Sequence, residues 1–176
     1  MKDLAMQVLH CSEVQFDKET ADKLPQIHYE FPNGFNHQFG SERFQIAEPL
    51  MDTSLLQGHI GSGIVPSSAL AIPQLVLNSI HMCDTEVGSS LYPNIIVVGG
   101  NSLLQGFTDR LYRELVQRTG PNVKLRINSS SSASDRRFSS WIGGSILASL
   151  GTFHQMWISK QEYEESGRTI VDKKCP

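Results

Sequence analysis

The feature that most constrains the fold is a β-branched run followed by two glycines and an amphipathic repeat. Residues 94–98 are Asn-Ile-Ile-Val-Val, and Gly99 and Gly100 follow. Apolar residues then recur every three or four positions, at Leu104, Phe107, Leu111 and Leu115. This pattern indicates a buried strand, a glycine turn and a helix that Gly120-Pro121 ends. With a second strand over residues 123–127, it predicts a mixed α/β sheet with a right-handed crossover.

Residues 27–39 predict a β-hairpin. Aromatic and polar residues alternate on both sides of Asn33-Gly34, and the ring-bearing positions are Tyr29, Phe31, Phe35, His37 and Phe39. Period-two alternation around Asn-Gly is typical of two antiparallel strands joined by a tight turn.

Four further helices are expected, over residues 2–10, 72–81, 135–150 and 152–165. The first begins without a cap before it, which suggests a chain that starts within a domain. The inner face of the second should carry Ile72, Val76 and Ile80. The last two are too apolar for free surface helices, so we expect them to pack against something. Short helical turns should precede Pro66, and the serine-dominated residues 128–134 predict a solvated, mobile loop.

Composition excludes several classes of protein. The chain has 176 residues, 39% of them hydrophobic and 19% charged, with a formal net charge of -3. This is a globular composition, and it gives no electrostatic basis for bulk binding to DNA or to an acidic membrane. The longest uninterrupted β-branched run, residues 95–98, is far shorter than a membrane span. Cys11, Cys83 and Cys175 have no CxxC spacing, so neither a disulfide framework nor a zinc site is expected.

No local motif predicts an enzyme. The chain has no P-loop, no GxSxG and no close pair of carboxylates for acid–base chemistry. Gly99-Gly100, between a strand and a helix, could let phosphate oxygens approach backbone N–H groups. A Gly-Gly turn after a buried strand more often serves only tight backbone packing. The pair Arg136-Arg137 could hold a phosphate, but a surface arginine pair near a helix start is usually only solvated. The residues alone therefore predict an α/β domain with a nucleotide link left open.

Two long segments resemble the C-terminal signature of the actin family. They are WIGGSILASL at residues 141–150 and MWISKQEY at residues 156–163. YEFPNG, SERF, Cys-Asp, Leu-Tyr and Gly-Gly lie upstream in actin's order and at nearly actin's spacing. The resemblance covers essentially the whole chain. FPNGF, residues 136–153 and the final proline look more like the nuclear actin-related subunit of Brahma-type (SWI/SNF) remodelers and related acetyltransferase complexes than like actin.

The resemblance implies an actin-like fold of ribonuclease H-like lobes, present as an incomplete C-terminal half. Residues 1–176 would supply the second lobe and the C-terminal helices of the first. The family binds ATP and a divalent cation between its lobes, and its phosphate-gripping loops lie mainly in the half that is absent here. ATP could therefore bind only the full-length parent. No cofactor, metal site or catalytic residue is expected in this segment alone.

The resemblance also assigns site residues. Gly99 and Gly100 match the family's nucleotide loop, and Arg137 stands where actin has an adenine-flanking lysine. Residues 103–104 replace a Met-Tyr pair beside the adenine, and residues 5–6 replace a lysine and a ribose-binding glutamate. Loss of that carboxylate removes charge-assisted hydrogen bonds worth roughly 1.5–3 kcal/mol. Weak nucleotide binding is expected even in the parent.

A second set of residues matches the hydrophobic cleft into which partners of actin insert amphipathic helices. These residues are Leu147, Leu150, Thr152 and Met156. Apolar residues at helical spacing usually belong to a core, and only the resemblance favours the cleft.

These features together predict a non-catalytic scaffold subunit of a nuclear chromatin-remodelling or histone-acetyltransferase complex. Its expected partners are a helix of the remodeler ATPase (helicase) subunit and actin or an actin-related protein, with chromatin contacted indirectly and no membrane. One alternative is a cytoskeletal, filament-forming ATP-binding protein. A stand-alone nucleotide hydrolase is the other. The departures from actin at residues 61–75 and 128–134 favour a complex subunit over a filament former.

Overall fold

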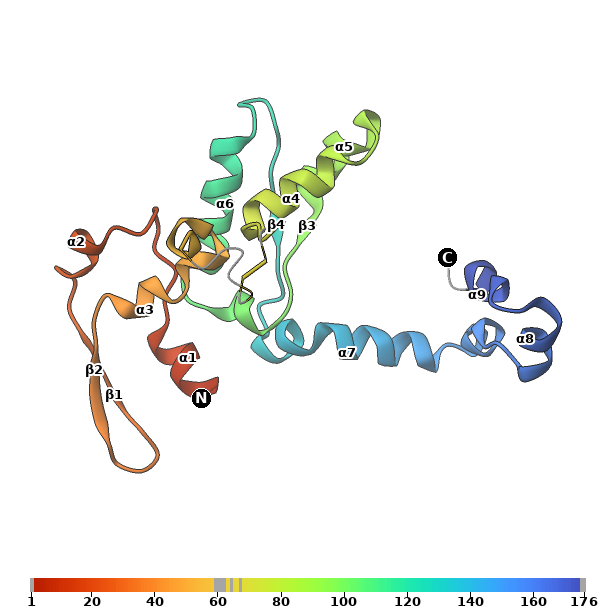
Figure 1. Ribbon diagram of the computed structural model, residues 1–176, viewed down its shortest axis with the longest axis horizontal. Helices are drawn as coiled ribbons and strands as arrows, with labels where there is room; N and C mark the ends of the chain where they lie inside the picture. The colour runs from red at the N-terminus through yellow and green to blue at the C-terminus, as the bar shows by residue number, and fades with distance from the viewer. Residues whose placement is uncertain (1, 59–62, 64, 67, 175–176) are drawn as a thin grey trace. The chain divides into compact units, whose positions relative to one another are not determined.

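The computed structural model describes residues 2–58, 63, 65–66 and 68–174. The chain divides into two compact units, unit 1 (residues 1–137) and unit 2 (residues 138–176). Figure 1 labels the α-helices and strands, which are α1 (Lys2–Val8), α2 (Lys18–Ala21), β1 (Ile27–Glu30), β2 (Asn36–Phe39), α3 (Glu42–Gln45), α4 (Ile72–His81), α5 (Thr85–Leu91), β3 (Ile95–Ile96), α6 (Phe107–Arg118), β4 (Ile127–Asn128), α7 (Ala133–Ser149), α8 (Lys160–Ser166) and α9 (Thr169–Lys174). The short 3-10 helices, which the figure leaves unlabelled, are η1 (Glu48–Leu50), η2 (Thr53–Leu56), η3 (Tyr92–Asn94), η4 (Gly100–Leu103) and η5 (Gly151–Met156).

The predicted strand–helix–strand order is confirmed. Strands β3 and β4 pair in parallel, with Ile95 opposite Ile127, and α6 lies between them in the sequence. The four periodic apolar residues are all buried, and they are Leu104, Phe107, Leu111 and Leu115. The three- and four-residue spacing thus identified the helix face that enters the core.

Both strands are shorter than predicted. Residues 94–98 and 123–127 were expected to be strands, but β3 has only two residues and β4 has only Ile127 and Asn128, of which only Ile127 falls in the predicted range. Val97 still donates its N–H to the Asn128 carbonyl at 2.9 Å, after which the chain turns at Gly99. Ile96 is 73% exposed, so the β-branched run has only one covered side. A ladder lengthens when neighbouring strands cover both edges, and among the described residues this sheet has two strands.

The predicted hairpin is confirmed. Strands β1 and β2 are antiparallel, with Tyr29 opposite His37. Gly34, at φ 81°, supplies the left-handed turn conformation that residues with a side chain rarely adopt. Phe35 donates its N–H to the Asn33 side-chain oxygen at 3.1 Å, which fixes the turn. The ring-bearing residues share one face and contact one another in series.

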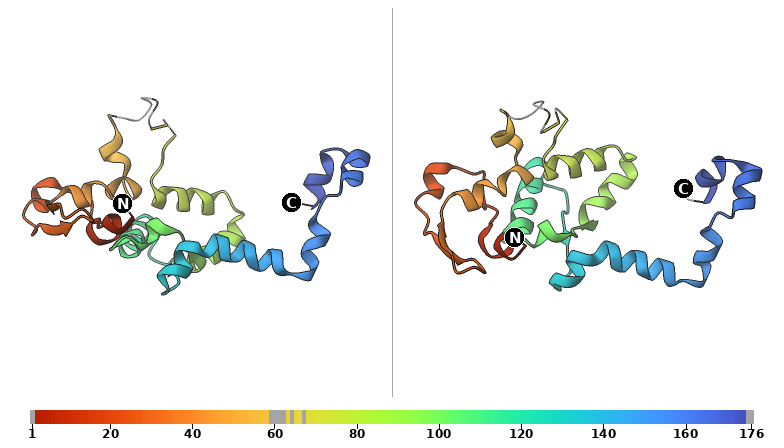
Figure 2. Two further views of the ribbon diagram at one scale, coloured as in Figure 1. Left: turned by 90° about the horizontal axis from the view of Figure 1, so that it is seen from below. Right: turned by 60° about the horizontal axis from the view of Figure 1, so that its bottom comes forward.

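The core of unit 1 forms where α4 and α6 meet, a contact that can be followed in Figures 1 and 2. Helix α4 has the predicted bounds. Its expected inner residue Ile80 is buried, while Ile72 and Val76 are half-buried against the core. Leu77, which was not predicted on that face, belongs to the buried cluster. The buried members are Cys11, Ala47, Met51, Leu77, Leu104, Phe107, Leu111 and Leu115.

Unit 2 has a different character. The helix predicted over residues 135–150 is confirmed as α7. The single helix predicted over residues 152–165 is wrong, because η5 ends at Met156 and the extended Trp157 interrupts it. The Ser159 side chain then accepts the N–H of Glu162, while Glu162 accepts the N–H of Ser159, and this capping box starts α8.

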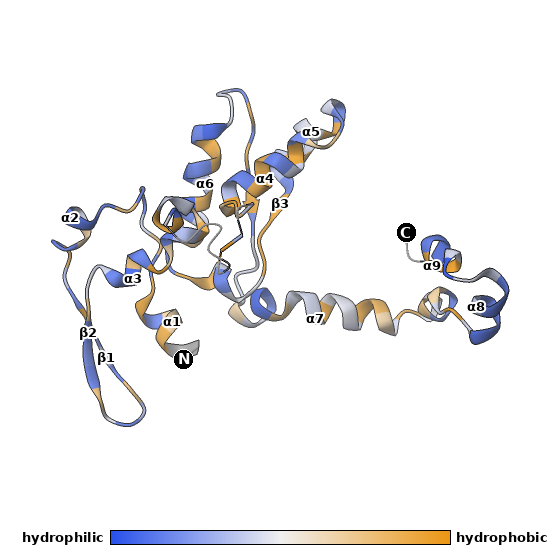
Figure 3. Cartoon of the chain, in the orientation of Figure 1, coloured by the Kyte–Doolittle hydropathy of each residue, from blue (hydrophilic) through white to orange (hydrophobic). Residues whose placement is uncertain are grey.

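No described residue of unit 2 falls in the buried class. Figure 3 shows that the C-terminal half of α7 is coloured toward the hydrophobic end of the scale. The exposed apolar side chains of unit 2 include both tryptophans of the chain, Trp141 and Trp157. Within the described ranges, no helix is long and apolar enough to span a membrane.

Candidate functional site

The glycine turn between β3 and α6 is the first candidate site. Gly99 has φ 96°, a value that favours glycine, and its Cβ position is empty of neighbouring atoms within 4 Å. Gly100 begins η4 and is equally uncrowded. These glycines therefore leave an open backbone surface. A close ligand could approach there, but Gly99 already donates its N–H to the Arg136 carbonyl at 2.8 Å.

The first turn of α7 closes onto this glycine turn. The Arg136 guanidinium donates to the Ser102 hydroxyl at 2.7 Å and to the Thr108 hydroxyl at 2.8 Å, and it also bonds the Ser102 carbonyl. Ser102 in turn donates its hydroxyl to the Gly99 carbonyl at 2.7 Å. Arg136 thus connects η4, α6 and α7, a structural role that sequence reasoning did not separate from that of its neighbour.

Arg137, which the resemblance places beside the nucleotide, directly follows Arg136, whose carbonyl accepts the Gly99 N–H. The structure therefore brings Gly99, Gly100 and Arg137 into one neighbourhood. The Arg137 side chain is half-buried. The two leucines after the glycines differ from each other, because Leu104 belongs to the buried core while Leu103 is half-buried. A buried Leu104 side chain is not available to a ligand.

The predicted partner residues lie on one continuous stretch of unit 2. Leu147 is in the last turn of α7, Leu150 precedes η5, and Thr152 and Met156 are in η5. Two backbone hydrogen bonds make the junction compact, from Leu150 N–H to the Leu147 carbonyl at 3.1 Å and from Phe153 N–H to the Leu150 carbonyl at 2.9 Å. Leu147, Leu150 and Met156 are 59%, 49% and 51% exposed. This stretch, residues 147–156, is called the apolar junction below.

A set of polar contacts at the C-terminal end of unit 2 follows the apolar junction. The Lys174 ammonium donates to the Glu162 carboxylate at 2.7 Å and to the Trp157 carbonyl at 2.8 Å. These contacts hold the pKa of Glu162 far below its usual value, at about 2, chiefly through the Lys174 hydrogen bond and then through the Ser159 N–H. The Trp157 ring contacts the rings of Phe153 and His154 edge-on. Lys174 therefore ties α9 to the turn that ends the apolar junction.

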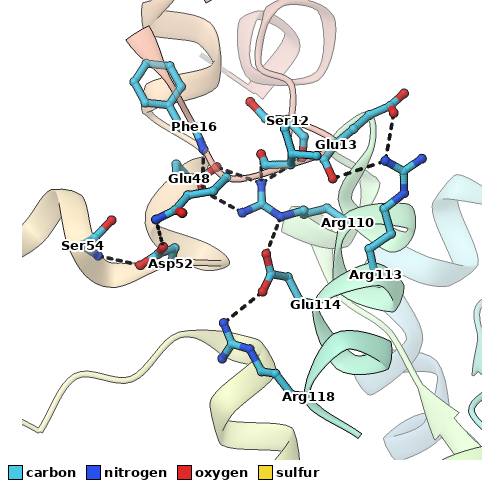
Figure 4. Close-up of polar contacts among 12 residues, drawn as sticks. Ser12, Glu13, Phe16, Glu48, Asp52, Ser54, Arg110, Arg113, Glu114 and Arg118 are labelled. Carbon is cyan, nitrogen blue, oxygen red and sulfur yellow. Dashed lines mark hydrogen bonds and ion pairs between the residues drawn. The ribbon is translucent and has the colours of Figure 1, made fainter. Parts of the chain in front are cut away.

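A buried ion pair in unit 1 was not predicted (Figure 4). Arg110 and Glu48 are each 1% exposed and meet through two hydrogen bonds of 2.8 and 3.1 Å. Arg110 also donates to Glu114 and to the carbonyls of Ser12 and Val14. The signal was present, because Arg110 stands three residues after Phe107 on the buried face of α6.

Electrostatics around this pair favour its charged form. Burial lowers the pKa of Arg110, but the hydrogen bonds to Glu48 and Glu114 outweigh it and raise the pKa above its ordinary value. Burial raises the pKa of the nearby Cys11 thiol to about 11, with Arg110 opposing and Glu48 adding to the rise. Each nitrogen of the Arg110 guanidinium donates to at least one acceptor, and Glu48 also accepts the N–H of Phe16. The cluster is therefore a structural connection between α6, η1 and the chain after α1.

Across the described part of the chain, no three His, Cys, Asp or Glu side chains gather as metal ligands. The terminal Lys-Cys-Pro of the resemblance includes residues 175–176, which lie outside the described residues.

Comparison with known proteins matches the entire chain to one family. The sequence profile described as Actin matches residues 1–176. Actin-related protein 4 of Emericella nidulans is 46% identical over 160 residues, which cover 90% of this chain and 34% of that protein. The proteins of the same name from Mycosarcoma maydis and Arabidopsis thaliana are 41% and 34% identical, each over 99% of this chain. The chain spans 39% and 40% of their respective lengths.

Proposed function

Since the chain belongs to the actin family, we propose that it acts as an actin-related scaffold subunit of a nuclear chromatin-remodelling or histone-acetyltransferase complex. The similarity to proteins named Actin-related protein 4 supports an actin-related protein. The narrower assignment to a Brahma-type (SWI/SNF) complex and to the nucleus is part of this proposal. The chain spans only 34% of the first of these relatives, so the activity of the whole protein is proposed with it.

The observation that carries the proposal is the exposure of the apolar junction. Leu147, Leu150 and Met156 present about half of their surfaces to solvent on adjacent turns. Burying such side chains releases roughly 25 cal/mol per Å² of apolar surface, which favours any partner that covers them. An amphipathic helix matches this need, because its apolar residues form a continuous stripe. We propose that the helix belongs to the ATPase subunit, with actin or an actin-related protein beside it.

The proposal includes the absence of catalysis by this chain. Phosphoryl transfer depends on positioned cations and donors around the γ-phosphate. This chain would contribute at most one side of a nucleotide site, through Gly99, Gly100 and Arg137. The Gly99 N–H already donates to the Arg136 carbonyl. We expect the purified chain to release no phosphate from magnesium-ATP above a buffer blank. Magnesium-dependent release that scales with protein concentration would overturn this part of the proposal.

Affinity purification of the tagged protein from nuclear extract tests the scaffold role. Recovery of a remodeler ATPase subunit, identified by mass spectrometry, is the expected result. Recovery of filament-binding proteins without a remodeler ATPase would instead favour a cytoskeletal protein.

A further inference from the structure

A cavity of about 580 Å³ lies in unit 1, away from the glycine turn. Its walls come from the end of α4, from α5, from η3 and from residues 122–124 before β4. Small-molecule sites are concave, mostly apolar and about 300–1,000 Å³ in volume. The cavity has the size of such a site, and its lining shares no residue with the apolar junction.

The lining combines an apolar wall with few polar groups. Its apolar lining includes Ile80, Tyr92, Pro93 and Val123. Ile80 is buried, and Gly88 lies against it without a side chain to fill the space. The Tyr92 hydroxyl lies 3.5 Å from His81 Nε2, which places two polar groups together on one wall. An apolar wall with a few polar groups favours an amphipathic ligand over an ion or a sugar.

The charge in the cavity lining indicates which polar group the ligand should carry. Lys124 is the one Lys, Arg, Asp or Glu among the described residues that line the cavity. No carboxylate among the described residues lies within 4.0 Å of its ammonium group, since none of the salt bridges of that part of the chain involves it. Lys124 is exposed, and a lysine without a carboxylate partner beside apolar surface attracts an anion.

We propose that this cavity binds a small amphipathic anion, with a flat apolar body against Ile80, Tyr92 and Val123 and a carboxylate or sulfonate beside Lys124. The site is independent of the proposed scaffold role, because it uses no residue of the apolar junction.

Cys83 provides a local reporter, because this exposed cysteine also lines the cavity. The probe is anilinonaphthalene sulfonate, an aromatic anion. A Cys175→Ser background removes the terminal thiol, and Cys11 is buried. Alkylation of Cys83 by iodoacetamide is then followed by peptide mass spectrometry. At a probe concentration ten times the dissociation constant, the fraction of protein without bound probe falls to about one eleventh. The rate of Cys83 alkylation should therefore fall about tenfold.

Variants separate the cavity from other apolar surface that binds the dye. Lys124→Glu should abolish protection of Cys83, Lys124→Arg should keep it, and Lys18→Glu should leave it unchanged as a remote charge reversal. Lys124→Gln replaces Lys124→Glu if circular dichroism shows the latter unfolded. An unchanged Cys83 alkylation rate under saturating probe would overturn the proposal. So would protection equal to that of the wild type in folded Lys124→Glu, or in Lys124→Gln where Lys124→Glu does not fold.

Discussion

Units 1 and 2 use similar apolar side chains in opposite ways. Leu111 and Leu115 of α6 are 1% and 0% exposed, whereas Leu147 and Leu150 in unit 2 are about half exposed. Helix α6 carries its leucines on one buried stripe together with Arg110, while Asp109, Arg113 and Arg118 are exposed on its other faces. The end of α7 is WIGGSILAS, in which apolar and small residues occupy every face. A helix with one apolar stripe can bury that stripe against one neighbouring element, whereas a helix that is apolar all round must be buried on several sides.

The two units also differ in how they hold their charges. The Arg110–Glu48 pair is sequestered and fully hydrogen-bonded, whereas Lys174 and Glu162 have side chains that are 24% and 40% exposed. Water screens the second pair and not the first, so similar short distances of 2.8 and 2.7 Å carry unequal energies. Four measurements test this contrast between a covered core and an exposed apolar surface.

The largest effect is expected from Glu48→Ala. This change leaves the buried Arg110 guanidinium without its bidentate carboxylate, and breaking a buried pair in this way costs about 3–5 kcal/mol. Urea unfolding followed by circular dichroism measures the loss.

Glu13→Ala is the matched control, because Glu13 forms an exposed ion pair with Arg113 at a similar distance of 2.9 Å. Its free energy of unfolding should fall by only about 0–1 kcal/mol. Equal losses from the two variants would show that burial does not distinguish the pairs.

A smaller effect is expected from truncating one leucine in each unit. Leu115→Ala removes methyl groups from the closed core of unit 1 and should destabilise the protein by about 2–5 kcal/mol. Leu147→Ala removes the same atoms from an exposed site and should change stability by no more than about 0.5 kcal/mol. The same unfolding experiment measures both variants. A large loss from Leu147→Ala would mean that the apolar junction is covered within the chain.

Acid should weaken the Lys174–Glu162 contact. Among these stability changes, this one should change the free energy of unfolding least. The pKa of folded Glu162 is lowered from 4.5 to about 2, so its contribution is full above pH 4.5 and is lost as pH falls toward 2. In a Trp141→Phe background, Trp157 fluorescence should change within this window. Glu162→Gln should remove that transition. A transition that persists unchanged in Glu162→Gln would assign it to another group.

The sequence predicted best the elements whose stabilising contacts are local. The spacing of Phe107, Leu111 and Leu115 identified α6 and its buried face, and Asn33-Gly34 identified the hairpin turn. The resemblance identified an actin-like fold, present in part, which the match to the Actin profile over residues 1–176 confirms.

Elements that depend on distant contacts were predicted less well. Strand length is set by neighbouring strands, which a β-branched run such as residues 94–98 does not specify. The Ser159–Glu162 capping box could have been found in the sequence. The apolar spacing of Phe153 and Met156 instead favoured one continuous helix, so the extended Trp157 between η5 and α8 was not predicted. The Arg110–Glu48 pair joins residues 62 positions apart, so only the helical register of Arg110 hinted at its burial. The predicted roles of Gly99, Arg137 and the apolar junction remain predictions.

The apolar junction is tested most directly by Leu150→Asp in the tagged chain used for capture from nuclear extract. A carboxylate buried without a partner is strongly unfavourable, and loss of a central interface contact commonly costs about 2 kcal/mol or more. Leu24→Asp is the matched control, since Leu24 is a similarly exposed leucine in unit 1, at 44%. We expect Leu150→Asp to retain the wild-type circular dichroism and melting temperature but to lose the remodeler ATPase subunit, while Leu24→Asp retains that subunit. Capture of the subunit at wild-type levels by folded Leu150→Asp would show that the partner helix does not bind the apolar junction.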